Sequence, residues 1–213
     1  MEKLFPGLHK FQSEIVPSRK RFFAQLAKGQ DPDAIFITCS DSRVDPALIT
    51  QTQPGQLFTI RNAGNIVPPK GSGSGEEASI EYGIDVLKIK DIVVCGHSHC
   101  GAMQGLLNPE SLTELPTVIR WLKHAEETKR ILDANYRDQD PEKVLNITVL
   151  ENVLVQLEHV RTLPAVRDAL TKGLVTLHAW MYEIETGTIY AYDPEVEAFT
   201  PLLSQQDSVL AKK

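Results

Sequence analysis

The residues that could do chemistry fall into two short motifs rich in cysteine and histidine. CSDSR carries Cys39, Asp41 and Arg43, and GHSHC carries His97 and Cys100. Two thiolates and one imidazole are ligands that zinc accepts, and three protein ligands leave the fourth tetrahedral position open. An open position is typical of catalytic zinc, whereas structural zinc takes four protein ligands. The pattern therefore favours a catalytic metal centre.

Simpler interpretations exist for the same residue types. A lone cysteine at a strand end is usually a small buried hydrophobe, and we interpret Cys95 in this way. Asp41 and Arg43 could form a surface ion pair worth roughly 0–1 kcal/mol. Their place beside a ligand instead favours an arginine fork that holds a carboxylate next to the metal, although the carboxylate could also bind the metal itself. We interpret His99 as solvent-facing; it is a candidate for proton transfer. The other histidines are interpreted as surface or hydrogen-bonded core residues: His9, His124, His159 and His178.

Both motifs follow runs that are typical of buried strands. Ala34 to Thr38 (AIFIT) and Ile92 to Cys95 (IVVC) are short and rich in β-branched residues, and Leu57 to Ile60 (LFTI) is a third such run. Between the last two, apolar residues in 80–87 recur at helical spacing. Strand, helix and strand in this order predict a parallel sheet. Ligands at the carboxyl ends of its strands would then meet at one edge.

The rest of the chain predicts helices followed by a closing hairpin. Pro116 to Asn135 and Leu150 to Val160 carry helical stripes, and Pro164 begins a short helix that ends at Gly173. Leu174 to Ile184 and Thr188 to Tyr192 are expected to pair as strands around an ETG turn.

These elements predict an α/β fold with a mostly parallel central β-sheet flanked by helices. A chain of 213 residues with 42% apolar residues can bury one substantial core. We expect a single domain over 1–213, divided into an N-terminal helical arm (1–30), an α/β core (31–203) that ends in the C-terminal antiparallel hairpin, and a tail (204–213).

Composition narrows the classes of partner. The formal charge of −6 argues against nucleic acid and anionic lipid as partners. No apolar run approaches the roughly 20 residues that cross a bilayer, and the first residues lack the apolar core of a secretion signal. Three cysteines in a chain of this size suggest free thiols or bound metal. We expect a cytoplasmic protein, or one inside a microcompartment of the cytoplasm.

Four longer motifs together resemble one known family. CSDSRVDP, RNAGNIVPP, CGHSHCGAM and ENVLVQL occur in this order, and they resemble the β-class carbonic anhydrases of the bacterial and cyanobacterial kind. The resemblance runs from about Leu8 to Pro201. It implies a zinc lyase that reversibly hydrates carbon dioxide to bicarbonate and a proton by means of zinc-bound hydroxide.

The resemblance also implies roles for individual residues. One Zn²⁺ per chain would be bound by Cys39, His97 and Cys100, beside the dyad of Asp41 and Arg43. The implied substrate-binding residues are Gln30, which hydrogen-bonds bicarbonate, Gly101, whose amide faces substrate, and three that line the carbon dioxide pocket: Phe58, Ala63 and Tyr82. In the family a neighbouring subunit supplies part of the pocket, so a homodimer or a higher even homo-oligomer is implied.

Two positions depart from part of the family. In some members the aspartate of the dyad binds zinc and so closes the site. These members carry a tryptophan at the position of Phe36 and a glycine at the position of Thr38. Arg61 and Tyr182 match the remaining positions of their bicarbonate pocket. Phenylalanine lacks the indole N–H donor, so we expect this pocket to be weakened and the dyad to stay paired.

Three other functions fit parts of the pattern. A related zinc enzyme could hydrolyse carbon disulfide or carbonyl sulfide, and a structural or adaptor protein could use zinc only for stability. Zinc alcohol dehydrogenases also use two cysteines and one histidine. The glycine-rich GSGSG stretch lacks the spacing of a dinucleotide fingerprint, however, which counts against the dehydrogenase.

Overall fold

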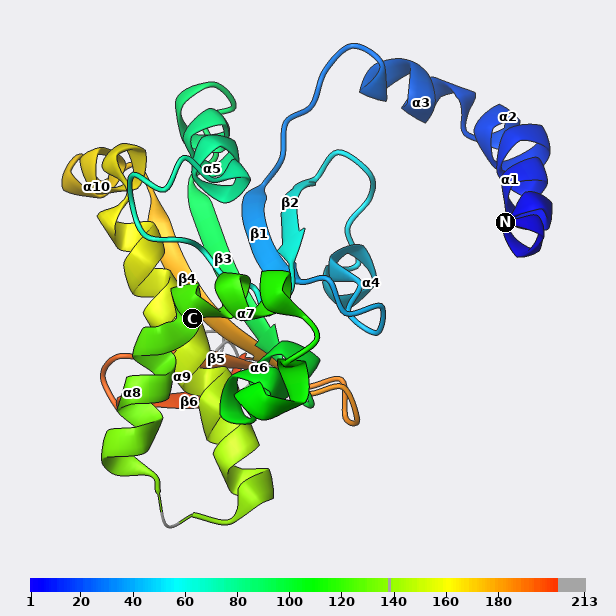
Figure 1. The fold of residues 1–213 in the computed structure, drawn as a ribbon. Coiled ribbons are helices and arrows are strands. Elements are labelled where there is room, and N and C mark those ends of the chain that lie inside the picture. Colours follow the sequence, from blue (N-terminus) through cyan, green and yellow to red (C-terminus); the bar gives the residue numbers. More distant parts are fainter. Residues whose placement is uncertain (138, 203–213) are drawn as a thin grey trace.

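The computed structural model describes residues 1–137 and 139–202, in which helices surround one mixed β-sheet (Figure 1). The strands are β1 Ala34–Cys39, β2 Leu57–Asn62, β3 Asp91–His97, β4 Thr176–Tyr182, β5 Ile189–Asp193 and β6 Ala198–Pro201. The α-helices are α1 Phe5–Lys10, α2 Val16–Ser18, α3 Lys20–Leu26, α4 Pro46–Thr50, α5 Gly75–Asp85, α6 Gly101–Leu107, α7 Pro116–Leu122, α8 Glu126–Asn135, α9 Pro141–Thr162 and α10 Pro164–Thr171. Short 3-10 helices are η1 Glu2–Leu4, η3 Pro109–Leu112 and η4 Lys123–Ala125, and a short π-helix is η2 Phe11–Ile15.

The sheet has the strand order β2-β1-β3-β4-β5-β6. The first four strands in this order are parallel, and β5 and β6 are antiparallel to their neighbours. The predicted fold class is thus confirmed, including the closing hairpin of β4 and β5. Because β1 and β3 are adjacent and parallel, the motifs that follow them lie at the same edge of the sheet.

The main core lies between the sheet and the helices α5, α9 and α10. Ile35 and Ile37 of β1, together with Ile92 and Val94 of β3, are fully buried in it. The alternate residues of the same strands point to the opposite face, where Phe36 packs with β3 and β4 residues. The alternation follows from the two-residue period of a strand. Each central strand is therefore apolar on both faces, which is why its sequence reads as a continuous apolar run.

The N-terminal segment forms a helical arm that extends away from the sheet (Figure 1). Helices α1 to α3 make up the arm, and an extended segment joins it to β1. Four large apolar side chains of the arm are 45–62% exposed: Leu4, Phe5, Leu8 and Phe11. The predicted arm is present in the structure, whereas the predicted tail, 204–213, lies outside the described residues.

Several details differ from the sequence-based expectation, which also included no helix at α6. The helix predicted over 116–135 is broken by η4, so that Leu122 of α7 packs with α6 while α8, in which Leu132 is buried, packs against α9. Helix α4 was not predicted, although its signal is present: Asp45 accepts hydrogen bonds from the amides of residues 47 and 48, and Pro46 is its first residue. Strand β6 was also not predicted, because pairing with β5 rather than local pattern defines it.

Candidate metal centre

The two predicted motifs meet at the carboxyl ends of β1 and β3. Cys39 is the last residue of β1, His97 is the last of β3, and Cys100 precedes the first residue of α6. One ligand atom from each residue lies within 4.8 Å of the others, and all three side chains are buried. The two sulfur atoms are 4.0 Å apart, close to the roughly 3.8 Å between two sulfurs that each lie 2.3 Å from a tetrahedral zinc.

His97 offers a nitrogen lone pair to this cluster. Its Nδ1 lies 2.9 Å from the carbonyl oxygen of Ser98, which can only accept, so Nδ1 carries the proton. Nε2 is therefore unprotonated in the neutral ring, and among the described residues it has no hydrogen-bond partner although it is fully buried. A buried, unpartnered nitrogen with a carbonyl on the other ring nitrogen is the usual state of a histidine that binds metal. The donor set thus fits zinc.

The two thiols share a hydrogen bond that separates their pKa values. The contact with Cys100, helped by the amide of Gly64 at 3.3 Å, holds the pKa of Cys39 below its usual range. The same contact, together with burial, raises the pKa of Cys100. Within this pair one sulfur therefore favours the thiolate, while the other keeps its proton more firmly. A divalent cation would displace the remaining proton, as is usual when thiolates bind metal.

Asp41 and Arg43 form the predicted fork beside the cluster. The Arg43 guanidinium donates to both carboxylate oxygens of Asp41, at 3.0 and 2.7 Å, and the Arg43 amide adds a third bond at 2.9 Å. These hydrogen bonds hold the pKa of Asp41 well below its usual range. Asp41 Oδ2 is 3.9 Å from Nε2 of His97. The carboxylate is thus ionised, held by the arginine and close to the ligand atoms without bonding them.

Arg61 fixes the backbone of the same loop, a role the sequence did not indicate. Its Nε donates to the carbonyl of Cys39 at 3.0 Å, and its Nη2 donates to the carbonyl of Asp41 at 2.7 Å. Phe36, matched to the same family pocket, is buried and packs edge-to-face on Trp180. In the structure Asp41 and Arg43 are paired.

Comparison with known proteins agrees with these motifs. The carbonic anhydrase family model matches residues 34–189, which is most of the chain and includes both motifs. The chain belongs to the carbonic anhydrase family. Carbonic anhydrases interconvert carbon dioxide and bicarbonate, and this is the reaction of the family.

Curated carbonic anhydrases align with nearly the whole chain. The enzyme of Synechocystis is 49% identical over 201 residues, which cover 93% of this chain and 73% of the relative. That of Synechococcus elongatus is 50% identical over 191 residues, covering 89% and 70%. That of Pseudomonas aeruginosa is 45% identical over 203 residues, covering 95% and 92%.

Solved structures place the chain among the β-carbonic anhydrases. The β-carbonic anhydrase CcaA has a TM-score of 0.92 and 49% identity, covering 94% of this chain and 98% of that one. A tetrameric β-carbonic anhydrase from Sordaria macrospora has a TM-score of 0.72 and 30% identity, covering 93% and 98%. The family and the fold are therefore the β-class, as the motifs indicated.

The carbonic anhydrase pocket residues separate into two groups. Ala63 follows β2 beside the cluster, where the adjoining Gly64 amide reaches Cys39, and Gly101 is the first residue of α6. Phe58 pairs with Ile35, four residues before Cys39 and about 13 Å from it along the strand. The other two members of this second group are Tyr82, stacked on Phe58 with ring centroids 6.3 Å apart, and Gln30, exposed in the segment before β1. Hence one carbonic anhydrase chain does not gather its whole predicted pocket.

The other cysteine and histidines of this carbonic anhydrase lie outside the cluster. Cys95 is fully buried with Phe36 and Val93, as predicted for a core residue. His99 is exposed, its imidazole hydrogen-bonds the carboxylate of Glu185, and its carbonyl accepts from the dyad arginine at 3.1 Å. The remaining polar contacts are Ser13 with His9, Asp91 with His178 at 2.8 Å, and the Val67 carbonyl with His159 at 2.7 Å.

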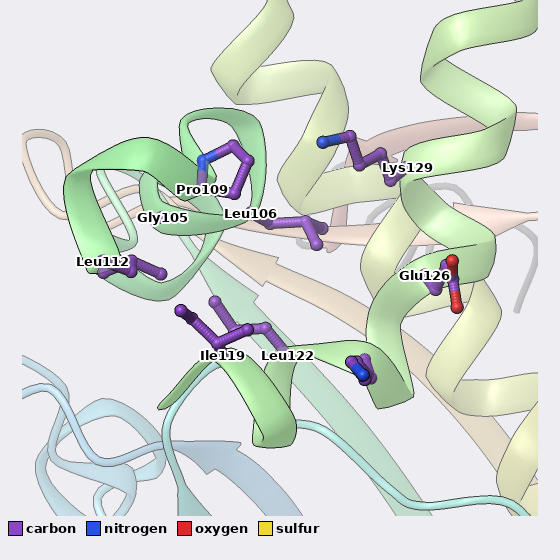
Figure 2. A pocket seen from close by; sticks show the side chains of 9 residues that line it. Gly105, Leu106, Pro109, Leu112, Ile119, Leu122, Glu126 and Lys129 are labelled. Atoms are coloured by element: carbon purple, nitrogen blue, oxygen red, sulfur yellow. The ribbon is translucent and has the colours of Figure 1, made fainter. Parts of the chain in front are cut away.

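A separate apolar pocket of about 150 Å³ lies between α6, η3, α7 and the start of α8 (Figure 2). Residues of α6, η3, α7 and α8 line it, with Leu106, Leu112 and Ile119 facing the space and Lys129 and Glu126 at the side. Its lining residues hold neither cysteine nor histidine. The chemistry of this carbonic anhydrase is therefore assigned to the metal centre and not to this pocket.

Proposed function

We propose that this chain catalyses the reversible hydration of carbon dioxide at one zinc ion held by Cys39, His97 and Cys100. The proposal rests mainly on the cluster of three buried residues whose ligand atoms lie within 4.8 Å of one another. Support comes from the unpartnered Nε2 of His97 and from the membership in the carbonic anhydrase family.

The residues around the cluster each have a distinct role in the proposed reaction. The chemistry that zinc supplies when bound is Lewis acidity, enough to make water a nucleophile near neutral pH. The Asp41 carboxylate, close to the ligand atoms, accepts a hydrogen bond from the attacking hydroxyl. This bond leaves a lone pair of the attacking oxygen directed at the carbon of the substrate. Arg43 keeps the carboxylate in place through two charge-assisted bonds. Gly101 presents a backbone amide at the start of α6 that can donate to bicarbonate.

The pocket is completed, in this proposal, by a second copy of the chain. Gln30, Phe58 and Tyr82 lie toward the opposite end of the strands from Cys39, so they serve the metal centre of a neighbour. Tyr82 is 46% exposed in the single chain, which leaves its ring free to face another subunit. Carbon dioxide is weakly polar, and the two aromatic rings would give it an apolar place, while Gln30 would donate to bicarbonate.

A homodimer or a higher even homo-oligomer follows from the same features. The exposed apolar side chains of the arm can pack on another subunit. Burying them there would stabilise the oligomer by about 25 cal/mol per Å² of apolar surface. The arm extends away from its own sheet (Figure 1), where it can reach another subunit. The Sordaria macrospora relative is described as tetrameric.

Residues 1–213 are proposed to act as one unit, with the arm over 1–30 and the core beginning at residue 31.

No helix among the described residues is long and apolar enough to span a membrane. All three cysteines are free, and a reducing compartment, the cytoplasm or a microcompartment within it, would keep them so.

Stopped-flow measurement of carbon dioxide hydration, with and without a zinc chelator, tests the proposed function. We expect about one zinc per chain and loss of activity when zinc is removed. Cys100→Ala should lose zinc and activity together, since two protein ligands hold zinc far less tightly than three. Cys95→Ala, the matched control, should keep both. Full zinc occupancy in Cys100→Ala would show the ligand assignment to be wrong.

The same preparation separates the proposal from its rivals. A hydrolase of carbon disulfide or carbonyl sulfide would release hydrogen sulfide from these substrates while failing to hydrate carbon dioxide. A purely structural zinc protein would unfold on zinc removal without ever showing turnover. The relatives at 45–50% identity all carry the name carbonic anhydrase, which favours hydration.

A further inference from the structure

The loop after β2 presents a backbone N–H to one of the proposed ligands. The amide nitrogen of Gly64 is 3.3 Å from Sγ of Cys39. Gly64 has φ +85°, and an added Cβ would lie 3.0 Å from Cβ of Ala102 and 3.1 Å from Cε of Met103. Only glycine lets the loop approach α6 so closely. An N–H that donates to a thiolate withdraws electron density from sulfur and so tunes the ligand.

Two side chains hold the two peptide groups that flank the Cα of Gly64. Trp121 Nε1 donates to the carbonyl oxygen of Ala63 at 2.8 Å, and Asn152 Nδ2 donates to the carbonyl oxygen of Gly64 at 3.0 Å. The Ala63 carbonyl and the Gly64 N–H belong to one planar peptide group. The bond from the indole therefore fixes the direction in which the N–H points.

Asn152 is itself fixed by a buried chain of hydrogen bonds from α9. Its Oδ1 accepts from Nε2 of Gln156 at 3.1 Å, and Oε1 of Gln156 accepts from the amide of Val67 at 2.9 Å. Asn152 and Gln156 are 1% and 0% exposed. If either amide turned over, two donors or two acceptors would face each other without water to separate them. The loop is therefore held at Gly64 and again at Val67.

We propose that Trp121 and Asn152 are positioning residues of the metal centre. They hold the Gly64 N–H against the sulfur of Cys39, and this contact sets both the donor strength of the thiolate and the affinity of the site for zinc. The inference rests on the proposed role of Cys39 as a zinc ligand. Both side chains act only through the backbone of the loop, in the manner of the outer-shell groups that orient and tune metal ligands.

Trp121→Phe is the first test, because it keeps an aromatic ring at this position while it removes the N–H donor together with the larger indole. The side chain is partly exposed, so the variant should fold. We expect zinc affinity, measured by competition with a chromophoric chelator, to fall about 10- to 100-fold, because the loop no longer holds the Cys39 thiolate in a fixed position for the metal. In the Co²⁺-substituted protein the thiolate-to-metal charge-transfer band should move to longer wavelength, because a sulfur without its N–H partner is more electron-rich. Asn152→Ala should show the same two changes.

Thr148→Ala is the matched control. Thr148 is fully buried on the same helix, α9, and its hydroxyl donates to the Val144 carbonyl within that helix at 2.6 Å. If Trp121→Phe matches this control in zinc affinity and in band position, the inference is overturned, even if thermal stability falls. If the wild-type protein binds no zinc, the proposed function fails instead. Should Asn152→Ala not fold, Trp121→Phe decides alone.

Discussion

At the scale of single residues, Asp41 stands between two possible partners. It is bonded by the fork of Arg43, yet one of its oxygens lies only 3.9 Å from Nε2 of His97. A small rotation would bring the carboxylate to a metal at the cluster, where it could occupy the position meant for water. The geometry of the arginine therefore decides whether the site is open.

Arg43→Lys should lower activity while leaving zinc in place. Lysine is a point charge and cannot hold a carboxylate through two parallel bonds, so Asp41 is freed to compete as a fourth ligand. We expect carbon dioxide hydration to fall about 10- to 100-fold at unchanged zinc content. Arg167→Lys, at an exposed ion pair with Asp168, is the control. Wild-type activity in Arg43→Lys would mean that the fork is dispensable.

Cys95 gives a prediction about stability against pH. Burial raises the pKa of its thiol to about 12, whereas an unfolded thiol ionises near pH 8.5, at about its model-peptide value. Between these values the native state keeps a proton that the unfolded state loses. The free energy of unfolding must then decrease as pH rises, by at most about 1.4 kcal/mol per pH unit from this group.

Urea unfolding at pH 8 and pH 10 measures this effect when wild type is compared with Cys95→Ala. The other two cysteines are the same in both proteins, so the difference isolates Cys95. We expect the variant to lose less stability than wild type over this interval. An equal loss in both would show that Cys95 ionises in the native state as readily as in the unfolded state.

At the scale of elements, the close packing of α9 on β3 sets the place of His97. Gly96 precedes His97 in β3, and an added Cβ at Gly96 would lie 2.7 Å from Cγ2 of Val153 and 2.9 Å from Cγ1 of Val149. Both valines belong to α9 and are buried. The missing side chain lets the long helix lie against the strand just before the ligand.

Gly96→Ala should destabilise the protein by about 1–3 kcal/mol, the usual cost of overpacking a core. Gly75→Ala is the control, because an added Cβ there meets nothing within 4 Å. Adding Val153→Ala to Gly96→Ala should recover part of the loss, since the two side chains compete for one space. Urea unfolding measures these three variants and Val153→Ala alone, which completes the double-mutant cycle. Strict additivity of the two substitutions would mean that the strain lies elsewhere.

At the scale of the whole molecule, the predicted pocket is divided between the two ends of the sheet. The ligands follow the carboxyl ends of β1 and β3, while Phe58 and Tyr82 stack together near the amino ends. In the proposed site, one chain thus supplies the metal ligands of one pocket and the aromatic residues of another. Activity should depend on association of subunits, so that a monomer at high dilution binds zinc but turns over slowly.

Mixing two inactive variants tests this dependence. Cys100→Ala removes the metal centre and Tyr82→Ala removes part of the pocket, so each homodimer should have low activity. A mixed dimer has one site with wild-type residues from both chains, and random mixing should restore about a quarter of wild-type activity. No recovery in mixtures shown to contain mixed dimers would indicate that each chain uses its own Tyr82. Full activity of a monomer would refute the shared pocket.

The sequence by itself determined the central strands, the fold class and the two chemical motifs. Short apolar runs such as AIFIT and IVVC indicate strands because they are too short for helices and rich in β-branched residues, and strands buried on both faces need no polar residues. Once these strands are parallel neighbours, residues just beyond their ends must meet, so Cys39, His97 and Cys100 were predictable as a group. The arginine fork was predictable as well, since its partners are two residues apart and bond locally.

Only the tertiary structure decided what surrounds that group. Trp121, Asn152 and Arg61 reach the site through hydrogen bonds to backbone carbonyls of distant loops, and such bonds leave no periodic trace in the sequence. The break at η4 and the pairing of β6 likewise depend on which elements pack together. Local patterns report how a segment buries its own side chains, whereas the support of a site depends on long-range contacts that form only when the chain is folded.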